Sequence, residues 1–316
     1  MAFRLLLLAL LLCPSSFAQD DPAGEIAVFR SDVQLAVVQF NVMFYNSYVS
    51  GLTAADFELV EDGRKIPIGI FENASLENQR PVEIIILLDS SGSVTGNKLL
   101  NEELFRTNLL EGQPGVSLSI YHFASHLLRM TGPTRDPSRI RTAFEGVVGR
   151  SRGEMLIPLG PPLGPSLIYE AVIAAIADAT RSRSAATRLV LVISDGIQNG
   201  GAADAESAGR YAQEAGVPVY PIVIGRQRSF LQSLDEPSSR FASLGKRTGG
   251  VDFPVGKLDD EKAKAIIQFI ADRVRHLYVV GYTPESRTPP RRRKVEVRLQ
   301  PQKKGTLIGG KRFIVN

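Results

Sequence analysis

The chain has 316 residues, of which 44% are apolar and 22% are charged, and its formal net charge is +4. This length allows one large or two moderate domains, each with a sizeable core. The mixed signs of the charges argue against a wholly disordered chain. The small net charge gives no indication of nucleic-acid binding, and we expect no nucleic-acid partner.

The first 18 residues have the pattern of a secretory signal peptide. Residues 1–4 carry one positive charge, residues 5–12 form an unbroken apolar run, and Ser16 and Ala18 place small residues two apart. The run is too short to span a bilayer, and cleavage is expected after Ala18. No later stretch is apolar enough to cross a membrane. We therefore expect an exported protein, periplasmic or secreted, with no transmembrane segment in the mature chain.

Cys13 is the single cysteine of the chain and lies within this signal. Cleavage removes it, which excludes disulfides, a thiolate nucleophile and zinc–cysteine sites from the mature protein. A lipid anchor would use Cys13, but residues 10–12 lack the small residue expected before a lipidated cysteine. A mature chain without cysteine suits a bacterial envelope or secreted protein.

Residues 19–80 predict a small all-β module. Apolar residues alternate with polar ones from 25 to 71, and many are β-branched or aromatic. Asp62-Gly63 is a strong hairpin signal between two such runs. The predicted elements are one long strand or two shorter ones over 33–44, a turn with a short helical corner over 51–57, and hairpin strands over 57–61 and 66–71.

The run from Val82 ends abruptly in Asp89. Residues 84–88 are all large and apolar, which leaves no polar face. This pattern predicts a strand buried on both faces, at the centre of a parallel sheet. Ligands of open α/β sheets bind outside the carboxyl ends of the strands, where Asp89 lies.

Strand and helix patterns alternate after Val82. Helices are predicted over 97–110, 136–147, 166–181, 203–215, 241–248 and 259–276, with strands over 116–123, 127–130 (a short edge strand), 188–195 and 217–224. Residues 151–165 are rich in proline and glycine and predict a loop. We therefore expect one doubly wound α/β domain over 81–276 with a mostly parallel sheet.

Residues 277–316 return to β character, with strands expected over 277–282 and 294–299 and a final turn and strand over 309–315. Forty residues are too few for an independent sandwich. We expect these strands to pair with the 19–80 module, so that the α/β domain is inserted in, or flanked by, a sandwich-like all-β module.

Three places offer side-chain oxygens at predicted carboxyl ends of strands. Asp89, Ser91 and Ser93 form an Asp-x-Ser-x-Ser loop, Ser166 opens a helix, and Asp195 follows a second buried strand. Mg²⁺ takes about six oxygen ligands and readily keeps waters among them. The five oxygens predict a Mg²⁺ site, with Mn²⁺ or Ca²⁺ as alternatives, and leave a position for another ligand.

These residues resemble the metal-ion-dependent adhesion site of the von Willebrand factor type A domain. Asp89, Ser91 and Ser93 match its Asp-x-Ser-x-Ser motif, Ser166 stands for its threonine, and Asp195 matches its aspartate at the end of the fourth strand. The serine keeps the hydroxyl but loses a methyl that stiffens the rotamer. Pro165 also stands where the family has a glycine.

The flanks are similar to one branch, the secreted bacterial von Willebrand factor A-related proteins abundant in acidobacterial proteomes. The matching stretches are Gly-Leu-Thr-x-x-Asp-Phe-x-x-x-Glu-Asp-Gly over 51–63 and Tyr-x-x-Gly-Tyr over 278–282. The resemblance implies protein binding or cell adhesion and no enzyme activity. The metal would accept an aspartate or glutamate carboxylate from a partner protein. In related adhesion domains this ligation is coupled to a shift of the last helix, here 259–276.

Simpler interpretations remain for each position. Asp89 could cap a loop, Ser166 could be a helix N-cap, and Asp195-Gly196 could be an ordinary turn. The site could also keep the fold without binding metal. His122 and His126 are four residues apart, but on a strand and turn they need not converge on a metal.

Two other functions are carried as alternatives. A metal-dependent envelope hydrolase would need a general base, and no histidine or glutamate is placed near the loops by the sequence. A metal-free structural or β-edge binding protein would not use the loops. The basic run 291–294 could meet an anionic polymer but is expected to be a solvated hairpin tip. The sequence indicates no oligomeric state.

Overall fold

The computed structural model describes residues 35–73, 80–90, 101–146, 155–158, 167–182, 186–198, 200–224, 237–255, 260–285 and 289–315. The predicted signal peptide and three of the predicted site residues, Ser91, Ser93 and Ser166, lie outside these ranges. Within them, no helix is both long enough and apolar enough to cross a membrane.

A seven-stranded, mostly parallel sheet forms the centre of the α/β part, in the order β12-β11-β10-β6-β7-β8-β9. Its strands are β6 (Val82–Asp89), β7 (Val116–Phe123), β8 (His126–Thr134), β9 (Met155–Pro158), β10 (Thr187–Ser194), β11 (Val219–Ile224) and β12 (Phe253–Val255). Only β8 is reversed, and it pairs antiparallel with both of its neighbours, β7 and β9. The predicted fold class is therefore confirmed, and β6 holds the predicted central position.

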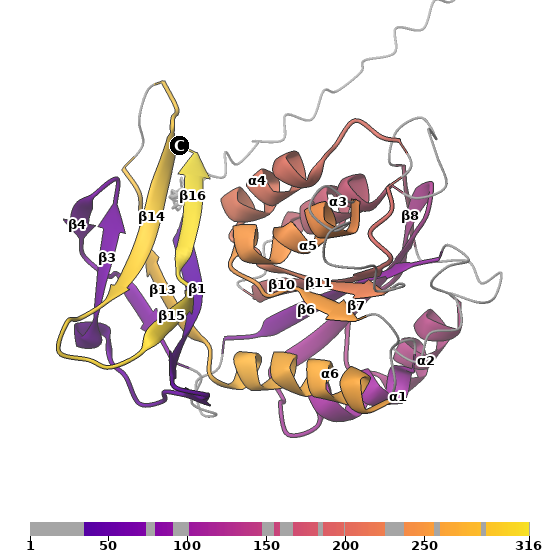
Figure 1. The fold of residues 1–316 in the computed structure, drawn as a ribbon, viewed down its shortest axis with the longest axis horizontal. Helices are drawn as coiled ribbons and strands as arrows, with labels where there is room; N and C mark the ends of the chain where they lie inside the picture. The colour runs from indigo at the N-terminus through magenta and orange to yellow at the C-terminus, as the bar shows by residue number, and fades with distance from the viewer. Residues whose placement is uncertain are drawn as a thin grey trace, which may run out of the picture. The chain divides into compact units, whose positions relative to one another are not determined.

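Helices cover both faces of this sheet, which explains why β6 has no polar face. One face packs against α1 (Glu102–Phe105, continued by a π-helical turn over Arg106–Leu110), α2 (Pro137–Glu145) and α6 (Asp260–Arg275). The other packs against α3 (Ile168–Arg181), α4 (Ala205–Ala215) and α5 (Pro237–Thr248), as Figure 1 shows.

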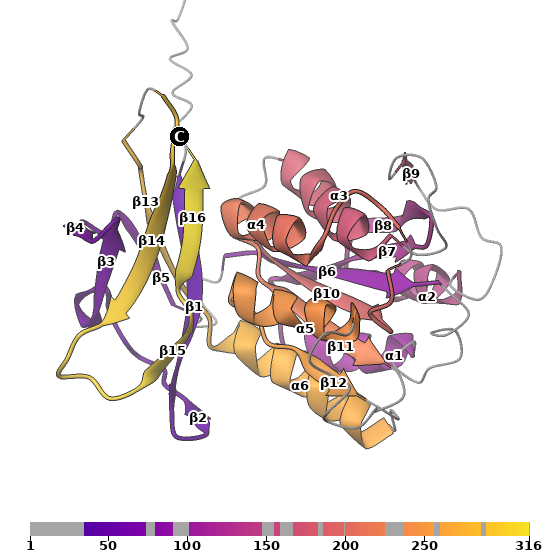
Figure 2. The same ribbon diagram turned by 45° about the horizontal axis from the view of Figure 1, so that its top comes forward.

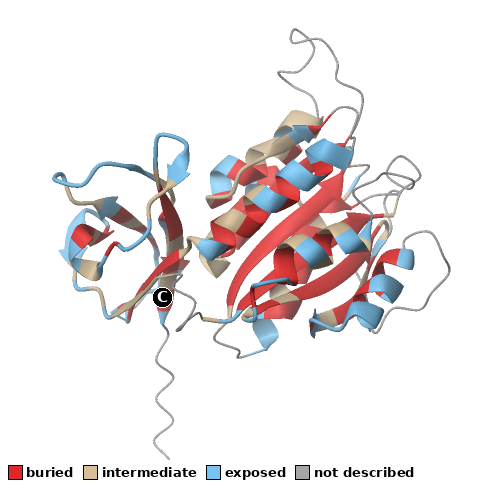
Figure 3. Ribbon diagram, turned by 90° about the horizontal axis from the view of Figure 1, so that it is seen from below, coloured by how far each residue is buried: buried red, intermediate tan, exposed pale blue. Residues whose placement is uncertain are grey.

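Alternate residues of β6 supply the two cores. Ile84, Ile86 and Leu88 join one hydrophobic cluster, whereas Ile85 and Leu87 join the other. All five side chains are fully buried. Figure 3 shows the sheet buried beneath helices that are partly exposed.

Two antiparallel sheets form a β-sandwich from both ends of the described chain. One sheet has the order β15-β1-β13-β5, with β2 beside β1, and the other has the order β16-β14-β3-β4. The strands are β1 (Ala36–Phe44), β2 (Ser47–Tyr48), β3 (Phe57–Glu61), β4 (Arg64–Ile66), β5 (Ile70–Glu72), β13 (Tyr278–Tyr282), β14 (Arg292–Leu299), β15 (Thr306–Gly309) and β16 (Lys311–Val315).

Pairing in both sheets joins strands that precede β6 to strands that follow α6. Ala36 of β1 lies opposite Tyr282 of β13, and Leu59 of β3 lies opposite Val297 of β14. Aromatic rings fill the shared core, where the Phe40 ring lies 4.9 Å from that of Phe57 and 5.7 Å from that of Tyr278. The β-sandwich therefore cannot form until both flanks of the α/β part have been made.

The hairpin predicted at Asp62-Gly63 is confirmed, but its second strand is shorter than predicted. Asp62 and Gly63 have φ angles of 45° and 86°, which is the geometry of a type I′ turn. The predicted strand over 66–71 is broken after β4. Pro67 has no N–H for the ladder, and the chain crosses to the other sheet, where β5 pairs with β13.

Two short strands of the parallel sheet were not predicted. β9 lies within the predicted loop 151–165 and pairs with β8, so β8 is not the edge strand that the sequence indicated. β8 is also longer than predicted, and β12 adds to the far edge. Strands of three or four residues are too short to show a hydrophobic period.

Polar side chains of β1 connect the β-sandwich to the α/β part. Gln39 Nε2 donates to the carbonyls of Arg188 (2.9 Å) and Gly216 (2.8 Å). Arg188 stands near the amino end of β10, so this contact is at the amino edge of the parallel sheet. The strands β6 and β10 run away from the β-sandwich, so their carboxyl ends lie on the far side of the sheet (Figure 2). Eight residues per strand separate the two edges by about 25 Å.

Candidate functional site

Asp89 ends β6 and has a fully buried side chain. The Oγ of Ser194, the last residue of β10, donates a hydrogen bond of 2.7 Å to Asp89 Oδ2. The register of the two parallel strands, with Leu88 beside Ile193, explains the contact. This bond brings the end of the second buried strand directly to the first predicted site residue.

Ser194 is a part of the site that the sequence interpretation did not include. Its Oγ also accepts from the Gly196 amide at 3.1 Å, so one hydroxyl fixes both the Asp89 carboxylate and the turn after β10. The sequence feature that could have indicated Ser194 is its position, a hydroxyl at the end of an apolar run directly before Asp195. A hydroxyl that is buried at such a strand end needs a hydrogen-bond partner.

Asp195 follows β10 and is half-buried. Its Oδ1 accepts from the Ile197 amide at 2.9 Å, which forms an Asx-turn. Gly196 has φ +78°, and a Cβ there would lie 2.8 Å from the Ser238 Cα. Glycine is thus required at this turn both by its backbone angle and by the close approach of α5.

The start of α3 is joined to the other loops at the same edge. The Leu167 amide donates to the Ala124 carbonyl in the β7–β8 turn (3.0 Å), and the Tyr169 amide donates to Gln198 Oε1 (2.9 Å). The N-cap position of α3 is Leu167, one residue after Ser166, which was predicted to open this helix. The chain that follows Ser166 therefore lies against the Asp195 loop.

Gln198 and Glu170 hold the segment after Asp195 in place, and neither was predicted. Gln198 Nε2 donates to the carbonyls of Gly200 (2.8 Å) and Ala203 (2.9 Å). Glu170 Oε1 accepts from the Ala203 amide at 2.8 Å. A Cβ at Gly201 would lie 2.2 Å from that Glu170 oxygen, so the glycine admits the carboxylate.

The first residue after β6 is held in the same way. The Ser90 amide and Oγ both donate to the Phe123 carbonyl, at 2.9 and 3.0 Å. Hydrogen bonds thus link four neighbouring segments along one edge of the sheet: the ends of β6, β7 and β10 and the start of α3.

The described residues contribute two carboxylates, Asp89 and Asp195, from neighbouring strands. Among the ranges given above, no group of three or more histidine, cysteine, aspartate or glutamate side chains is gathered to hold a metal. The other predicted ligands, Ser91, Ser93 and Ser166, lie outside those ranges. A donor set of carboxylates and hydroxyls fits a hard cation such as Mg²⁺, Mn²⁺ or Ca²⁺ rather than a thiolate- or imidazole-binding metal.

The two histidines of β7 and β8 do not form a second metal site. His122 is buried, and burial lowers the pKa of its imidazole to about 4, so it is neutral at pH 7. His122 pairs with Leu128 across the ladder, whereas His126 is exposed at the start of β8. The two imidazoles therefore lie in different surroundings, although the residues are only four apart in the sequence.

The basic run 291–294 was predicted to be a solvated hairpin tip; Arg291, Arg292 and Lys294 are exposed, but the prediction is wrong for Arg293. Arg293 is buried and forms an ion pair with Glu61, while its Nη2 donates to the Glu285 carbonyl at 2.8 Å. Arg292 begins β14 and pairs with Glu214 of α4. Two consecutive arginines of the run thus each pair with a carboxylate of another element, Arg292 with α4 and Arg293 with β3.

No protein-family model matches the chain, and no curated protein gives a significant match. Among solved structures, the chain is similar to BatB from Bacteroides thetaiotaomicron, with 22% identity over 60% of this chain and 98% of that chain and a TM-score of 0.42. A von Willebrand factor type A protein from Catenulispora acidiphila is 11% identical over 82% of this chain and 72% of that chain, with a TM-score of 0.45.

The von Willebrand factor domain of the type V pili tip protein Mfa5 from Porphyromonas gingivalis is also 11% identical, over 66% of this chain and 99% of that chain, with a TM-score of 0.40. These likenesses concern the fold, and TM-scores this low carry no argument about the site or its function. The narrower resemblance to secreted acidobacterial proteins stays a prediction.

Proposed function

We propose that the protein is an exported binding module that holds Mg²⁺ at Asp89, Ser91, Ser93, Ser166 and Asp195. The ion would bind an aspartate or glutamate carboxylate of a partner protein. Five protein oxygens leave about one position of the magnesium shell for an incoming oxygen. The bound ion supplies a positive charge and that open position.

The hydrogen bond from Ser194 to Asp89 is the observation that carries this proposal. It joins the carboxyl ends of two parallel strands, so that two acidic residues far apart in sequence belong to one sheet edge. Ligand sites of open α/β sheets lie at such an edge. The second acid, Asp195, is kept at this edge by the turn that Ser194 and Gly196 build.

The surrounding residues support a binding site on a rigid frame. Gln198 and Glu170 tie the Asp195 loop to α3, and Ser90 ties the Asp89 loop to β7. A ligand site held by such supporting contacts loses less entropy on binding than a mobile one. No specific observation favours the hydrolase alternative, and we propose binding rather than catalysis.

Metal-dependent capture tests this function. The mature chain from Gln19, immobilised, is exposed to envelope extract in Mg²⁺ or in EDTA, beside the variants Asp195→Ala and Asp272→Ala. Asp272 is a half-exposed aspartate on α6 that pairs with Arg275, and it serves as the matched control. We expect partners that are retained in Mg²⁺ by the wild type and by Asp272→Ala, but released by EDTA and not captured by Asp195→Ala. Partners held equally in EDTA and by Asp195→Ala would contradict the proposal.

A further inference from the structure

A polar pocket of about 150 Å³ lies between α4, α5 and the strands β14 and β16, away from the candidate metal site. Three arginines from three different elements line it: Arg210 of α4, Arg247 of α5 and Arg292 of β14. Arginine presents a planar fork of donors that matches the oxygens of an oxyanion. The pocket is large enough for such a group with several waters.

Arg292 is fixed in the pocket by contacts on three sides. Its Cζ lies 3.5 Å from the centroid of the Phe313 ring, its Nη2 donates to Gln213 Oε1 at 2.9 Å, and its Nε donates to Glu214 Oε1 at 3.1 Å. Stacking on an aromatic face leaves the edge of a guanidinium free to donate in its own plane. Its orientation is thus set before any ligand arrives.

Arg247 supplies a charge that no carboxylate of the described residues pairs with. Its stem passes over Gly209, where a Cβ would lie 3.5 Å from the Arg247 Cδ. Its Nε donates to the neutral Ser243 Oγ at 3.3 Å, and its backbone carbonyl accepts from Gln213 Nε2. Across the described ranges, no carboxylate forms an ion pair with Arg247, in contrast to Arg210 and Arg292.

The acids near the pocket leave an excess of positive charge. Glu206 pairs with Arg210 at 3.2 Å, but both side chains are more than half exposed. An exposed pair four residues apart on a helix is weak and opens at little cost. Glu214 neutralises Arg292, so Arg247 provides the uncompensated charge.

We propose that this pocket binds an oxyanion of the phosphate or sulfate class. Forked donors that approach from three elements suit a tetrahedral group, because a planar carboxylate is satisfied by one arginine. Gln213 links two of the arginines, donating to the Arg247 carbonyl and accepting from Arg292, and so fixes their spacing. This site does not depend on the proposed metal site.

Calorimetric titration at constant ionic strength, with inorganic phosphate, methyl phosphate and sodium sulfate as separate probes, tests the proposal. We expect saturable binding of at least one probe, weakened about tenfold or more in Arg247→Gln, because a charged hydrogen bond is removed. Glu206→Gln should bind more tightly, since it removes the competing carboxylate. Arg275→Gln, an exposed arginine of α6, should match the wild type.

Binding of methyl phosphate at least as tight as that of inorganic phosphate would assign the pocket to a phosphate group on a larger molecule. Tighter binding of the free ion would assign it to inorganic phosphate, and either result supports the site. Absence of saturable binding by all three probes would overturn the proposal, and so would an equal loss in Arg247→Gln and Arg275→Gln. Glu206→Gln tests the site by a gain in affinity, which misfolding cannot imitate.

Discussion

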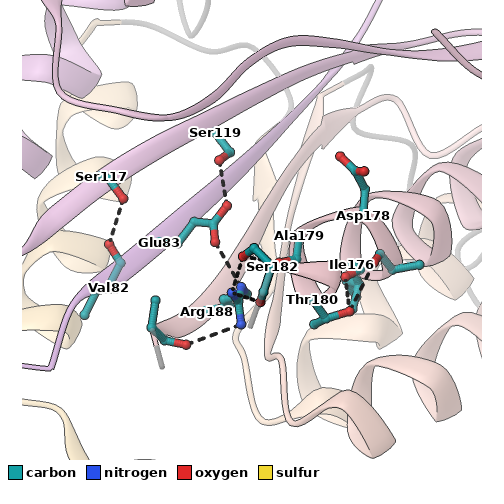
Figure 4. A network of polar contacts seen from close by, with 12 residues as sticks. Val82, Glu83, Ser117, Ser119, Ile176, Asp178, Ala179, Thr180, Ser182 and Arg188 are labelled. Atoms are coloured by element: carbon teal, nitrogen blue, oxygen red, sulfur yellow. Dashed lines mark hydrogen bonds and ion pairs between the residues drawn. The ribbon is translucent and has the colours of Figure 1, made fainter. Parts of the chain in front are cut away.

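At the scale of single side chains, Glu83 and Arg188 form a buried ion pair in the α/β part. Glu83, at the amino end of β6, accepts from Arg188 Nε at 2.9 Å and from Ser119 Oγ at 2.6 Å (Figure 4). The two charged side chains are only 4% and 9% exposed. Arg188 Nη2 also donates to Ser182 Oγ at 3.1 Å. The ion pair therefore lies in a network of hydrogen bonds that engages both charged side chains.

Glu83→Ala should destabilise the protein by about 3 kcal/mol, because Arg188 would remain buried without its carboxylate. Urea unfolding of the variant beside the wild type measures this difference. Glu206→Ala, which breaks the exposed pair with Arg210, is the matched control and should change the free energy of unfolding by less than about 0.5 kcal/mol. Equal effects of the two substitutions would show that burial of the pair does not matter.

His122 should make stability fall in acid. Burial lowers its folded-state pKa to about 4 from 6.5, so between these values the unfolded chain binds more protons than the native one. Its contribution is therefore fully present above about pH 6.5 and is lost as the pH falls toward 4, with an upper bound of about 3 kcal/mol. The free energy of unfolding measured over this range should fall less steeply in His122→Leu than in the wild type.

His126→Leu provides the control for the pH experiment, since His126 is exposed on the neighbouring strand. Its pH dependence should match that of the wild type. If His122→Leu and the wild type lose stability in parallel between pH 6.5 and 4, His122 is not kept neutral by burial.

The residues of the candidate site differ in how well the sequence predicts them. Asp89 directly follows an uninterrupted apolar run, and Asp195 follows another after a single serine, so their positions at strand ends could be predicted. Ser194, Gln198 and Glu170 could not, because their partners are set by strand register and by loop paths that carry no periodic signal. The sequence thus located the two aspartates of the candidate site, but not the side chains that position them and their loops.

At the scale of elements, one side chain ties the first strand to the last helix. Asn41 of β1 is fully buried, and its Nδ2 donates to the carbonyls of Arg273 (2.9 Å) and His276 (2.8 Å) at the end of α6. The final carbonyls of a helix have no partner within it. Asn41 therefore acts as a cap supplied by another part of the fold.

Asn41→Asp should destabilise the protein by about 2 kcal/mol or more. It replaces the donor with an acceptor and places negative charge at the negative end of the helix dipole. Asn101→Asp, at the N-cap of α1, is a matched control, because its Oδ1 accepts from the Glu103 amide and an aspartate can do the same. Thermal unfolding that shifts equally in the two variants would refute the capping role of Asn41.

Element type was predictable where the hydrophobic pattern was long. β7 has the predicted bounds, and α2 lies within the predicted helix 136–147, with Asp136 Oδ1 accepting from the Ser138 amide at 2.9 Å as its N-cap. The missed strands β9 and β12 are held by their neighbours in the sheet rather than by their own sequence. Similarly, Arg293 is buried because Glu61 faces it from β3, which local sequence could not indicate.

At the scale of the whole molecule, the β-sandwich occupies the amino edge of the parallel sheet through Gln39, and the acids Asp89 and Asp195 lie at the opposite edge. Arg312 of β16 strengthens the first contact by donating to the carbonyls of Val37 (2.6 Å) and Glu214 (2.5 Å). The carboxyl edge is thereby kept clear of the β-sandwich, as the proposed ligand site requires. The sequence predicted the doubly wound sheet, whereas these contacts depend on tertiary packing.

Calorimetric titration of the mature chain with Mg²⁺, with acetate present as a source of carboxylate, tests the metal site most directly. Asp89→Asn keeps an acceptor for Ser194 and should fold with a stability within about 1 kcal/mol of the wild type. We expect saturable Mg²⁺ binding by the wild type and by the half-exposed control Asp272→Asn, and none by Asp89→Asn. Saturable binding that persists in Asp89→Asn, or its absence in the wild type, would contradict a cation site at this edge of the sheet.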